Sequence, residues 1–278
     1  MNRKRVPPSM IAGSVILIFF ALIAIFADNL MPFEMDQMFK PYQKPCAEHW
    51  LGTNDIGQDI LSELLLGTRV TLLTGTAAAF FVVLIGTAIG VAAGYLGGIT
   101  DKILSALTSV FMAIPSLPFT IVLVTFLEPS IWNIVVAICL TSWTSTARVV
   151  RSKVAELKEQ PFIKIEETLG QRKWYIMVRH LLPNISEIIL MRSTLAVSSA
   201  MLTEASISFM GLGVYNQKSW GSILYYAFQR NGVVANFYWW YVPPIICISL
   251  CIFAFVLIGY YGVGSSKRID RNGYSVQE

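Results

Sequence analysis

The sequence is poor in charged residues. Asp, Glu, Lys and Arg make up 14% of the 278 residues, and 55% are apolar, whereas a soluble domain has about 25% charged residues. The chain also contains several apolar runs of about 20 residues, the length that crosses a bilayer as a helix. These two features predict a membrane-spanning protein.

Common motifs of catalysis are missing as well. The sequence has no Walker A motif, no His-Glu-x-x-His and no Gly-x-Ser-x-Gly, which excludes nucleotide binding and hydrolysis by those routes. The two histidines, His49 and His180, are expected on opposite sides of the membrane, so they cannot share a metal ion. We therefore predict no catalytic residue, no metal site and no cofactor in this chain. No long basic tract indicates nucleic acid.

The four cysteines give no disulfide framework and no Cys-x-x-Cys pair.

Six apolar runs lie at about 10–30, 70–95, 103–127, 131–147, 188–210 and 240–263. Backbone amides in hydrocarbon must be bonded within their own segment, so each run is predicted to be a helix. The first run lacks a small-x-small cleavage site before Asp28, and we expect it to be retained rather than removed as a signal peptide. The predicted fold class is an all-α membrane protein with six transmembrane helices.

The distribution of positive charge sets the orientation. Of the 21 Lys and Arg residues, 15 lie in the N-terminus, the 96–102 turn, the 148–184 loop and the C-terminal tail. By the positive-inside rule, both termini and the long loop are cytoplasmic. We divide the chain into an N-terminal helix with an extracytoplasmic segment (1–68), a five-helix domain (69–265) and a cytoplasmic tail (266–278).

The extracytoplasmic segment is acidic and contains the run His49 to Asp59, whose glycines, Asn and Asp indicate a tightly turned loop. We expect a folded cap over helix ends, with contact to a docking protein as the alternative. In the second apolar run, Gly86, Gly90 and Gly94 recur every four residues. This spacing predicts close packing against another helix.

Several residues in the apolar runs are candidates for a transport pathway. Pro115 and Pro118 each remove a backbone donor from the third helix, which predicts a kink facing protein or a water-filled path. Glu204 lies deep in the fifth helix, where a carboxylate faces a partner or a cavity; packing and pathway roles both stay open. Arg192, about one turn into that helix, is expected to reach the interface with its long side chain.

The segment from Phe162 to Asn184 is the longest charged interruption between apolar runs. Phe162, Ile165 and Leu169 recur at intervals of three and four, which predicts a short helix with one apolar stripe. Gly170 is placed to end that helix in a left-handed conformation, and Pro183 precedes the next helix. We interpret the loop as a docking surface for a soluble partner; the alternative is an amphipathic helix lying on the membrane surface.

Four blocks of sequence, in this order, carry a resemblance to a known family. The chain resembles the permease subunits of ATP-binding-cassette importers of the dipeptide, oligopeptide and nickel family, and within it the shorter, C-type subunit. The blocks are His49-Trp50-Leu51-Gly52-Thr53 to Asp59, Gly86 to Gly98, Ala147-Arg148-Val149-Val150-Arg151 to Pro183-Asn184, and Glu204 to Gly213 with Ser219-Trp220-Gly221.

The resemblance implies a type I ABC importer permease fold in the bacterial inner membrane. It implies a second permease subunit, two cytoplasmic ATPases that use ATP and Mg²⁺, and an extracytoplasmic substrate-binding protein as partners, besides membrane lipid. In the family, a short coupling helix carries Glu-Ala-Ala, three residues and Gly. Lys164, Ile165 and Glu166 stand at the first three positions here, while Gly170 and Leu182-Pro183 are kept. The predicted ATPase-coupling set is Phe162, Lys164, Ile165, Glu166, Leu169, Gly170 and Pro183.

We therefore hypothesise one of two permease subunits of an importer for peptides, nickel or a nickel chelate. The short N-terminus and the turn Glu128 to Asn133 lean slightly toward the nickel branch. An ion-coupled secondary transporter is the alternative within transport. An intramembrane hydrolase is a less supported alternative, because Glu204 is its only clear candidate acid.

Overall fold

The computed structural model describes residues 7–215 and 217–273, and for residues 261–273 it describes the backbone alone. Helices account for most of this part of the chain, and the longest connection is the external segment 31–59. The elements are α1 (Pro8–Leu30), α2 (Ile60–Leu96), α3 (Gly98–Ala113), α4 (Ser116–Phe126), α5 (Ile131–Lys158), α6 (Pro161–Thr168), α7 (Lys173–Ile176), the π-helix η1 (Met177–Leu181), α8 (Leu182–Asn184), α9 (Ser186–Ile207), the π-helix η2 (Ser208–Leu212), α10 (Trp220–Gln229) and α11 (Tyr238–Gly273).

Six membrane crossings are present when one broken helix pair is counted as a single crossing. Five helical segments are long and apolar enough to span a bilayer, namely α1, α2, α5, α9 with η2, and α11. The sixth crossing is the pair α3 and α4, which are bent by 85° relative to each other. The all-helical fold with six crossings is thereby confirmed, although the third crossing is not one continuous helix.

Helix boundaries differ from the predicted runs in three places. α2 begins at Ile60 because the Asp59 side chain caps it, accepting a hydrogen bond from the Ser62 amide at 2.9 Å. α5 continues past residue 147 to Lys158, because Val150 and Val154 keep a buried stripe after the hydrophobic run has ended. α11 begins at Tyr238, before the predicted start at about residue 240, so that Pro243 and Pro244 lie inside the helix.

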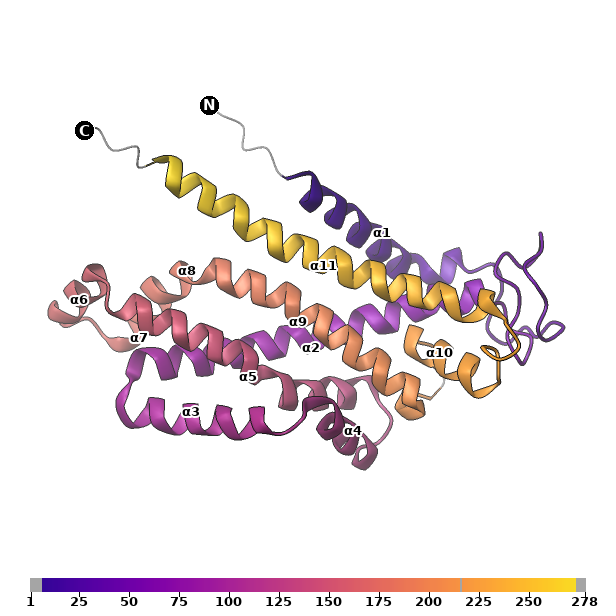
Figure 1. Ribbon diagram of the computed structural model, residues 1–278, viewed down its shortest axis with the longest axis horizontal. Helices are drawn as coiled ribbons and strands as arrows, with labels where there is room; N and C mark the ends of the chain where they lie inside the picture. The colour runs from indigo at the N-terminus through magenta and orange to yellow at the C-terminus, as the bar shows by residue number, and fades with distance from the viewer. Residues whose placement is uncertain (1–6, 216, 274–278) are drawn as a thin grey trace.

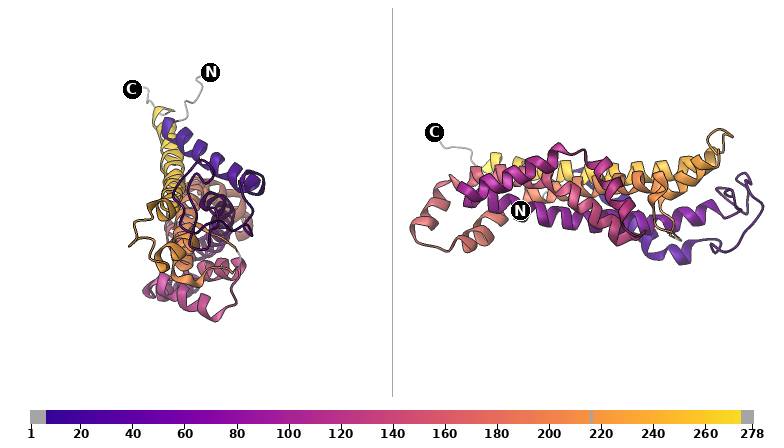
Figure 2. Two further views of the ribbon diagram at one scale, coloured as in Figure 1. Left: turned by 90° about the vertical axis from the view of Figure 1, so that its right-hand side faces the viewer. Right: turned by 90° about the horizontal axis from the view of Figure 1, so that it is seen from below.

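The bundle is elongated, and its two ends differ. Figure 1 shows α6 and α7 at one end and α10 with the external segment 31–59 at the other, while α1 begins and α11 ends toward the α6 end. Seen along the long axis, α1 and α11 form one edge and α3 and α4 the opposite edge (Figure 2). α2 lies between them and packs most extensively on α5 and α9. Of the predicted tail, residues 266–273 continue α11 and residues 274–278 lie outside the described part.

The glycine series of α2 lies against α5, which confirms the predicted close packing against another helix. A Cβ atom added to Gly86, Gly90 or Gly94 would lie 2.7–2.8 Å from a carbonyl oxygen of α5, and the three carbonyls belong to Trp143, Ala147 and Arg151. Each step of one turn on α2 matches one turn on α5. Because lipid offers no hydrophobic driving force for helix association, the stability of this pair depends on van der Waals contact at short range.

This contact predicts how a larger side chain at one of these glycines changes the stability of the protein. Gly90→Leu should lower the free energy of unfolding of the detergent-purified protein by about 1–3 kcal/mol, the usual cost of overpacking, because the new side chain meets Ala147 and Val150. Ala88→Leu is the matched control, since Ala88 lies two residues away on the exposed side of α2. Thermal unfolding measures both variants, and equal melting temperatures would contradict the packing account.

Candidate functional site

The third crossing contains a complete break in the helix. Ile114 is extended (φ −84°, ψ 127°) and Pro115 precedes α4 with φ −59° and ψ 118°. Pro118 lies in the first turn of α4, where its missing N–H removes no helical hydrogen bond. The kink expected from two prolines is therefore a break at Ile114 and Pro115, and Pro118 has no part in breaking the helix.

The break lines a cavity of about 520 Å³ inside the membrane-spanning part of the molecule. Ile114, Pro115 and Ser116 form one wall, and α2, α5 and α9 supply the others. Non-helical backbone at membrane depth is tolerated where it is buried in protein or faces a water-filled cavity. The other walls carry hydroxyl groups from Thr141, Ser142, Thr144, Ser145, Thr146 and Ser199.

Arg192 also lines this cavity. Its Nη2 donates a hydrogen bond to Ser145 Oγ at 2.7 Å. Ser145 precedes the end of α5 by 13 residues, or about 20 Å at the helical rise. The sequence did not indicate this contact with α5; the expected reach of the side chain to the interface stays a prediction.

Glu204 occupies a different place. It is 1% exposed and accepts a hydrogen bond from Ser208 Oγ at 2.7 Å, one helical turn further along the chain. At the same level Gly221 of α10 approaches so closely that a Cβ there would lie 2.5 Å from the Ala205 carbonyl oxygen. This geometry corresponds to the packing role left open for Glu204. Neither Glu204 nor Pro118 lines the membrane cavity, and a pathway role for either stays a prediction.

At the cytoplasmic end, the predicted short helix is α6. Its apolar stripe faces outward, with Phe162 40%, Ile165 58% and Leu169 69% exposed. The opposite side is anchored by Ile163, which is fully buried in one cluster with Val154 of α5, among others. α6 is therefore fixed to the end of α5, and the described residues leave its apolar stripe uncovered.

Gly170 ends α6 in the predicted left-handed conformation, with φ +74°. The Gly170 amide donates to the Glu167 carbonyl at 3.1 Å and the Gln171 amide to the Glu166 carbonyl at 3.1 Å. This pair of bonds is the Schellman motif, which satisfies the last carbonyls of a helix. A Cβ atom at Gly170 would have no heavy atom within 4 Å, so backbone conformation rather than space favours glycine here.

Of the remaining members of the predicted coupling set, Lys164 and Glu166 lie on α6 and Pro183 follows it in the chain. Lys164 Nζ is 2.9 Å from Glu159 Oε2, and hydrogen bonding to Lys164 lowers the pKa of that exposed carboxyl. Glu166 Oε1 lies 3.5 Å from His180 Nε2 of η1. Pro183 belongs to the short α8, just before α9 begins at Ser186. Geometry thus brings these residues to one end of the molecule, and their contact with a partner stays a prediction.

The external segment folds into the expected cap. His49 is buried between Phe33 and Phe39, and its Nδ1 lies 2.9 Å from Asp59 Oδ1. Asn54 Oδ1 accepts hydrogen bonds from the amides of Ile56 and Gln58 at 3.0 and 2.9 Å. Asp59 therefore joins the cap to the first turn of α2, since its second carboxylate oxygen caps that helix.

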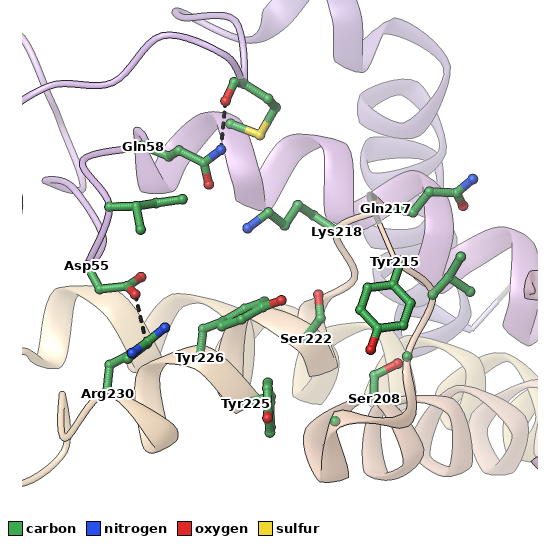
Figure 3. Close-up of a pocket in the computed structure, with 15 residues that line it drawn as sticks. Asp55, Gln58, Ser208, Tyr215, Gln217, Lys218, Ser222, Tyr225, Tyr226 and Arg230 are labelled. Atoms are coloured by element: carbon green, nitrogen blue, oxygen red, sulfur yellow. Dashed lines mark hydrogen bonds and ion pairs between the residues drawn. The ribbon is translucent and has the colours of Figure 1, made fainter. Parts of the chain in front are cut away.

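A second cavity of about 490 Å³ lies between the cap and α10 (Figure 3). Two ion pairs cross from the cap side to the segment around α10. Arg230 Nε is 3.1 Å from Asp55 Oδ2, and Lys218 Nζ is 2.6 Å from the buried Glu63 Oε1. These contacts tie the outer ends of α2 and α10 together.

Sequence reasoning missed the hydroxyl lining of the membrane cavity and the two external ion pairs. The run Thr141 to Thr146, with five hydroxyl residues around Trp143 inside an apolar segment, was an available signal for a polar wall. The ion pairs join positions far apart in the chain, and no local pattern indicates them.

Comparison with known proteins gives one consistent result. Residues 86–261 match the family described as binding-protein-dependent transport system inner membrane component. The chain is 33% identical over 266 residues to the oligopeptide transport system permease protein OppC of Bacillus subtilis, covering 93% of this chain and 85% of that protein. It is 32% identical to the dipeptide permease DppC of the same species, with 89% and 78% covered. It is also 32% identical to the glutathione transport system permease protein GsiD of Pectobacterium atrosepticum, with 89% and 82% covered.

A solved structure shares the fold. The match is to an inward-facing structure of the MetNI methionine ABC transporter, with a TM-score of 0.59 and 18% sequence identity over 74% of this chain and 97% of that chain. At this identity the likeness concerns the fold, which is that of a type I importer permease.

The cap geometry predicts the effect of removing Asp59. Asp59→Ala removes the cap of α2 and leaves His49 buried without its partner, which should cost at least about 1 kcal/mol of stability. The external segment should then be cleaved faster by a non-specific protease added from outside. Glu48→Ala is the control, since Glu48 is an exposed acidic residue of the same segment. Equal cleavage rates for the two variants would contradict this role of Asp59.

Proposed function

The chain belongs to the family of binding-protein-dependent transport system inner membrane components, as a multi-pass permease subunit of an ABC importer, and from this premise we propose its role within that importer. It forms half of the translocation pathway for short peptides, and a second permease subunit forms the other half. Two cytoplasmic ATPases drive it through α6. An extracytoplasmic binding protein delivers the solute.

The membrane cavity supports the pathway part of this proposal. It lies at the break between α3 and α4, it is large enough for a small solute, and hydroxyl groups line it. Figure 2 places α3 and α4 at the edge of the bundle opposite α1 and α11. A second permease subunit packed on this edge would enclose the cavity between two chains.

The single observation that carries the coupling proposal is the apolar stripe of α6. Phe162, Ile165 and Leu169 are exposed at the cytoplasmic end of a protein whose sequence contains no Walker A motif. The stripe is held firmly from behind by Ile163 and has a defined end at Gly170. A partner ATPase that receives this stripe in a cleft would move α6 and the end of α5 together. Resting on lipid is the alternative for the same stripe.

Peptides are the favoured cargo. The relatives compared above are named as oligopeptide, dipeptide and glutathione permeases. The slight lean toward nickel rested on the short N-terminus and the turn Glu128 to Asn133, and no further observation supports it. Among the described residues no group of three His, Cys, Asp or Glu side chains could hold a metal ion, and the membrane cavity carries a positive charge, which disfavours a free metal cation.

The hydrolase alternative has one geometric feature in its favour, the hydrogen bond between Ser208 and Glu204. Glu204 is almost completely buried and lies outside the membrane cavity, so a substrate bound there cannot reach it. Membership of a transport family favours the permease reading further.

Gly170 gives the test of coupling. In the complete importer, Gly170→Glu should lower ATP-driven peptide uptake about tenfold while ATP hydrolysis continues, because a side chain in the left-handed region costs about 1–2 kcal/mol and the end of α6 must shift. Gly170→Asn is the matched control, since Asn tolerates that conformation, and it should retain most uptake. Normal uptake by Gly170→Glu at normal membrane levels would refute the coupling role.

A further inference from the structure

Arg192 is the only charged side chain among the described residues that line the membrane cavity. The other lining groups are hydroxyls, apolar side chains and the backbone of the α3–α4 break. No lining residue supplies a carboxylate. The guanidinium therefore sets the sign of the electrostatic potential in this space.

The hydrogen-bonding capacity of Arg192 is mostly unused within the described chain. A guanidinium has five N–H donors. Nη2 donates to Ser145 Oγ at 2.7 Å, and Nε is buried without a hydrogen-bond partner among the described residues. Salt bridges in the described part of the chain involve other arginines, such as Arg69 with Asp28 and Arg151 with Asp101.

A charge in this position is costly unless an anion or water compensates it. Ionisable groups inside membrane segments are rare, and they face a partner or a cavity. The planar guanidinium with its fork of donors matches a carboxylate, which accepts two parallel hydrogen bonds. The hydroxyls of Ser142, Ser145 and Ser199 on the same cavity can bond the peptide groups attached to such a carboxylate.

From these observations we infer that Arg192 is a binding site for the carboxylate of the transported solute as it passes through the cavity. The inference rests on the proposed function and assigns the solute class as short peptides with a free C-terminus or other small carboxylates. It predicts that a peptide with an amidated, uncharged C-terminus passes without this interaction. It also explains why a free divalent cation would be repelled at this point.

An acidic side chain of the second permease subunit is the other possible source of a carboxylate that pairs with Arg192. Such a pair would neutralise Arg192 permanently and leave the assembled cavity without excess positive charge. The absence of a carboxylate among the described lining residues and the hydroxyls that line the same cavity favour the solute. The experiment is designed to separate the two sources.

The test labels a cysteine in the cavity with thiol reagents of opposite charge. Ser199→Cys, in a background without the four native cysteines, is placed in the complete importer in detergent without ATP. The rate of reaction with the anionic sulfonatoethyl methanethiosulfonate, divided by the rate with the cationic trimethylammonioethyl methanethiosulfonate, is the charge ratio. Because a cleft of one sign concentrates counter-ions by about 10–10³-fold, Arg192→Gln should lower this ratio about tenfold or more. Arg192→Lys should retain most of it, and Lys102→Gln, an exposed change on α3, should leave it unchanged.

Protection by ligand identifies the carboxylate. Millimolar trialanine should slow the anionic reagent at Ser199→Cys, and trialaninamide should not; Arg192→Gln should abolish the difference. An unchanged charge ratio in Arg192→Gln, or equal protection by the two peptides, would overturn the inference. A ratio that is high in this chain alone and low in the assembled importer would assign the carboxylate to the partner subunit, and would overturn it as well.

The labelling requires neither ATP nor transport. A failure of the proposed transport function can therefore be distinguished from a failure of the carboxylate site at Arg192. If proteoliposomes with the complete importer take up no trialanine, the proposed function is wrong while the charge ratio still reports on Arg192. If uptake is normal and Arg192→Gln changes neither ratio nor protection, the function stands and the carboxylate site does not. Should Arg192→Gln assemble poorly, the comparison of trialanine with trialaninamide at Ser199→Cys, with Arg192 in place, still tests the claim, because equal protection overturns it.

Discussion

The close contact between α2 and α5 is the constraint on which the rest of the structure depends. Three glycines of α2, one per turn, let the two backbones approach until only hydrogen atoms fit between Gly90 and the Ala147 carbonyl. Within lipid such short-range packing replaces the hydrophobic effect as the source of helix association. α2 also packs on α1, α9 and α10, so α5 is connected to these helices through α2.

α5 connects the two regions to which we assign function. Its middle carries Thr141 to Thr146, which form the hydroxyl wall of the membrane cavity. Its cytoplasmic end carries Val154, which packs with Ile163 of α6. Because the helix is continuous over both regions, a displacement of α6 by an ATPase would reach the cavity through one rigid element. The break at Ile114 and Pro115, which lines another wall of the cavity, interrupts the helical hydrogen bonds of the third crossing.

Local patterns predicted the local structure well. Periodic glycines predicted close packing of α2 on another helix, without identifying that helix as α5. The apolar stripe and Gly170 predicted α6 and its left-handed end. Hydropathy placed the crossings but not the ends of α2, α5 and α11, because capping by Asp59 and buried contacts beyond the hydrocarbon extend the helices. The positions of the two prolines in the sequence did not indicate that Pro115 precedes α4 as its N-cap, or that Pro118 lies in the first turn of α4, where it removes no helical hydrogen bond. The direction of the Arg192 side chain was missed because it depends on Ser145, 47 residues away.

The central claim is that this chain transports solute only as part of an ATP-driven assembly. The most direct measurement is uptake of trialanine into proteoliposomes that contain this chain alone, the two permeases, or the complete importer with ATPases and binding protein. We predict uptake by the complete importer with ATP and none by the smaller sets, with or without an ion gradient. Accumulation by this chain alone under a proton or sodium gradient would contradict the account and establish an ion-coupled carrier.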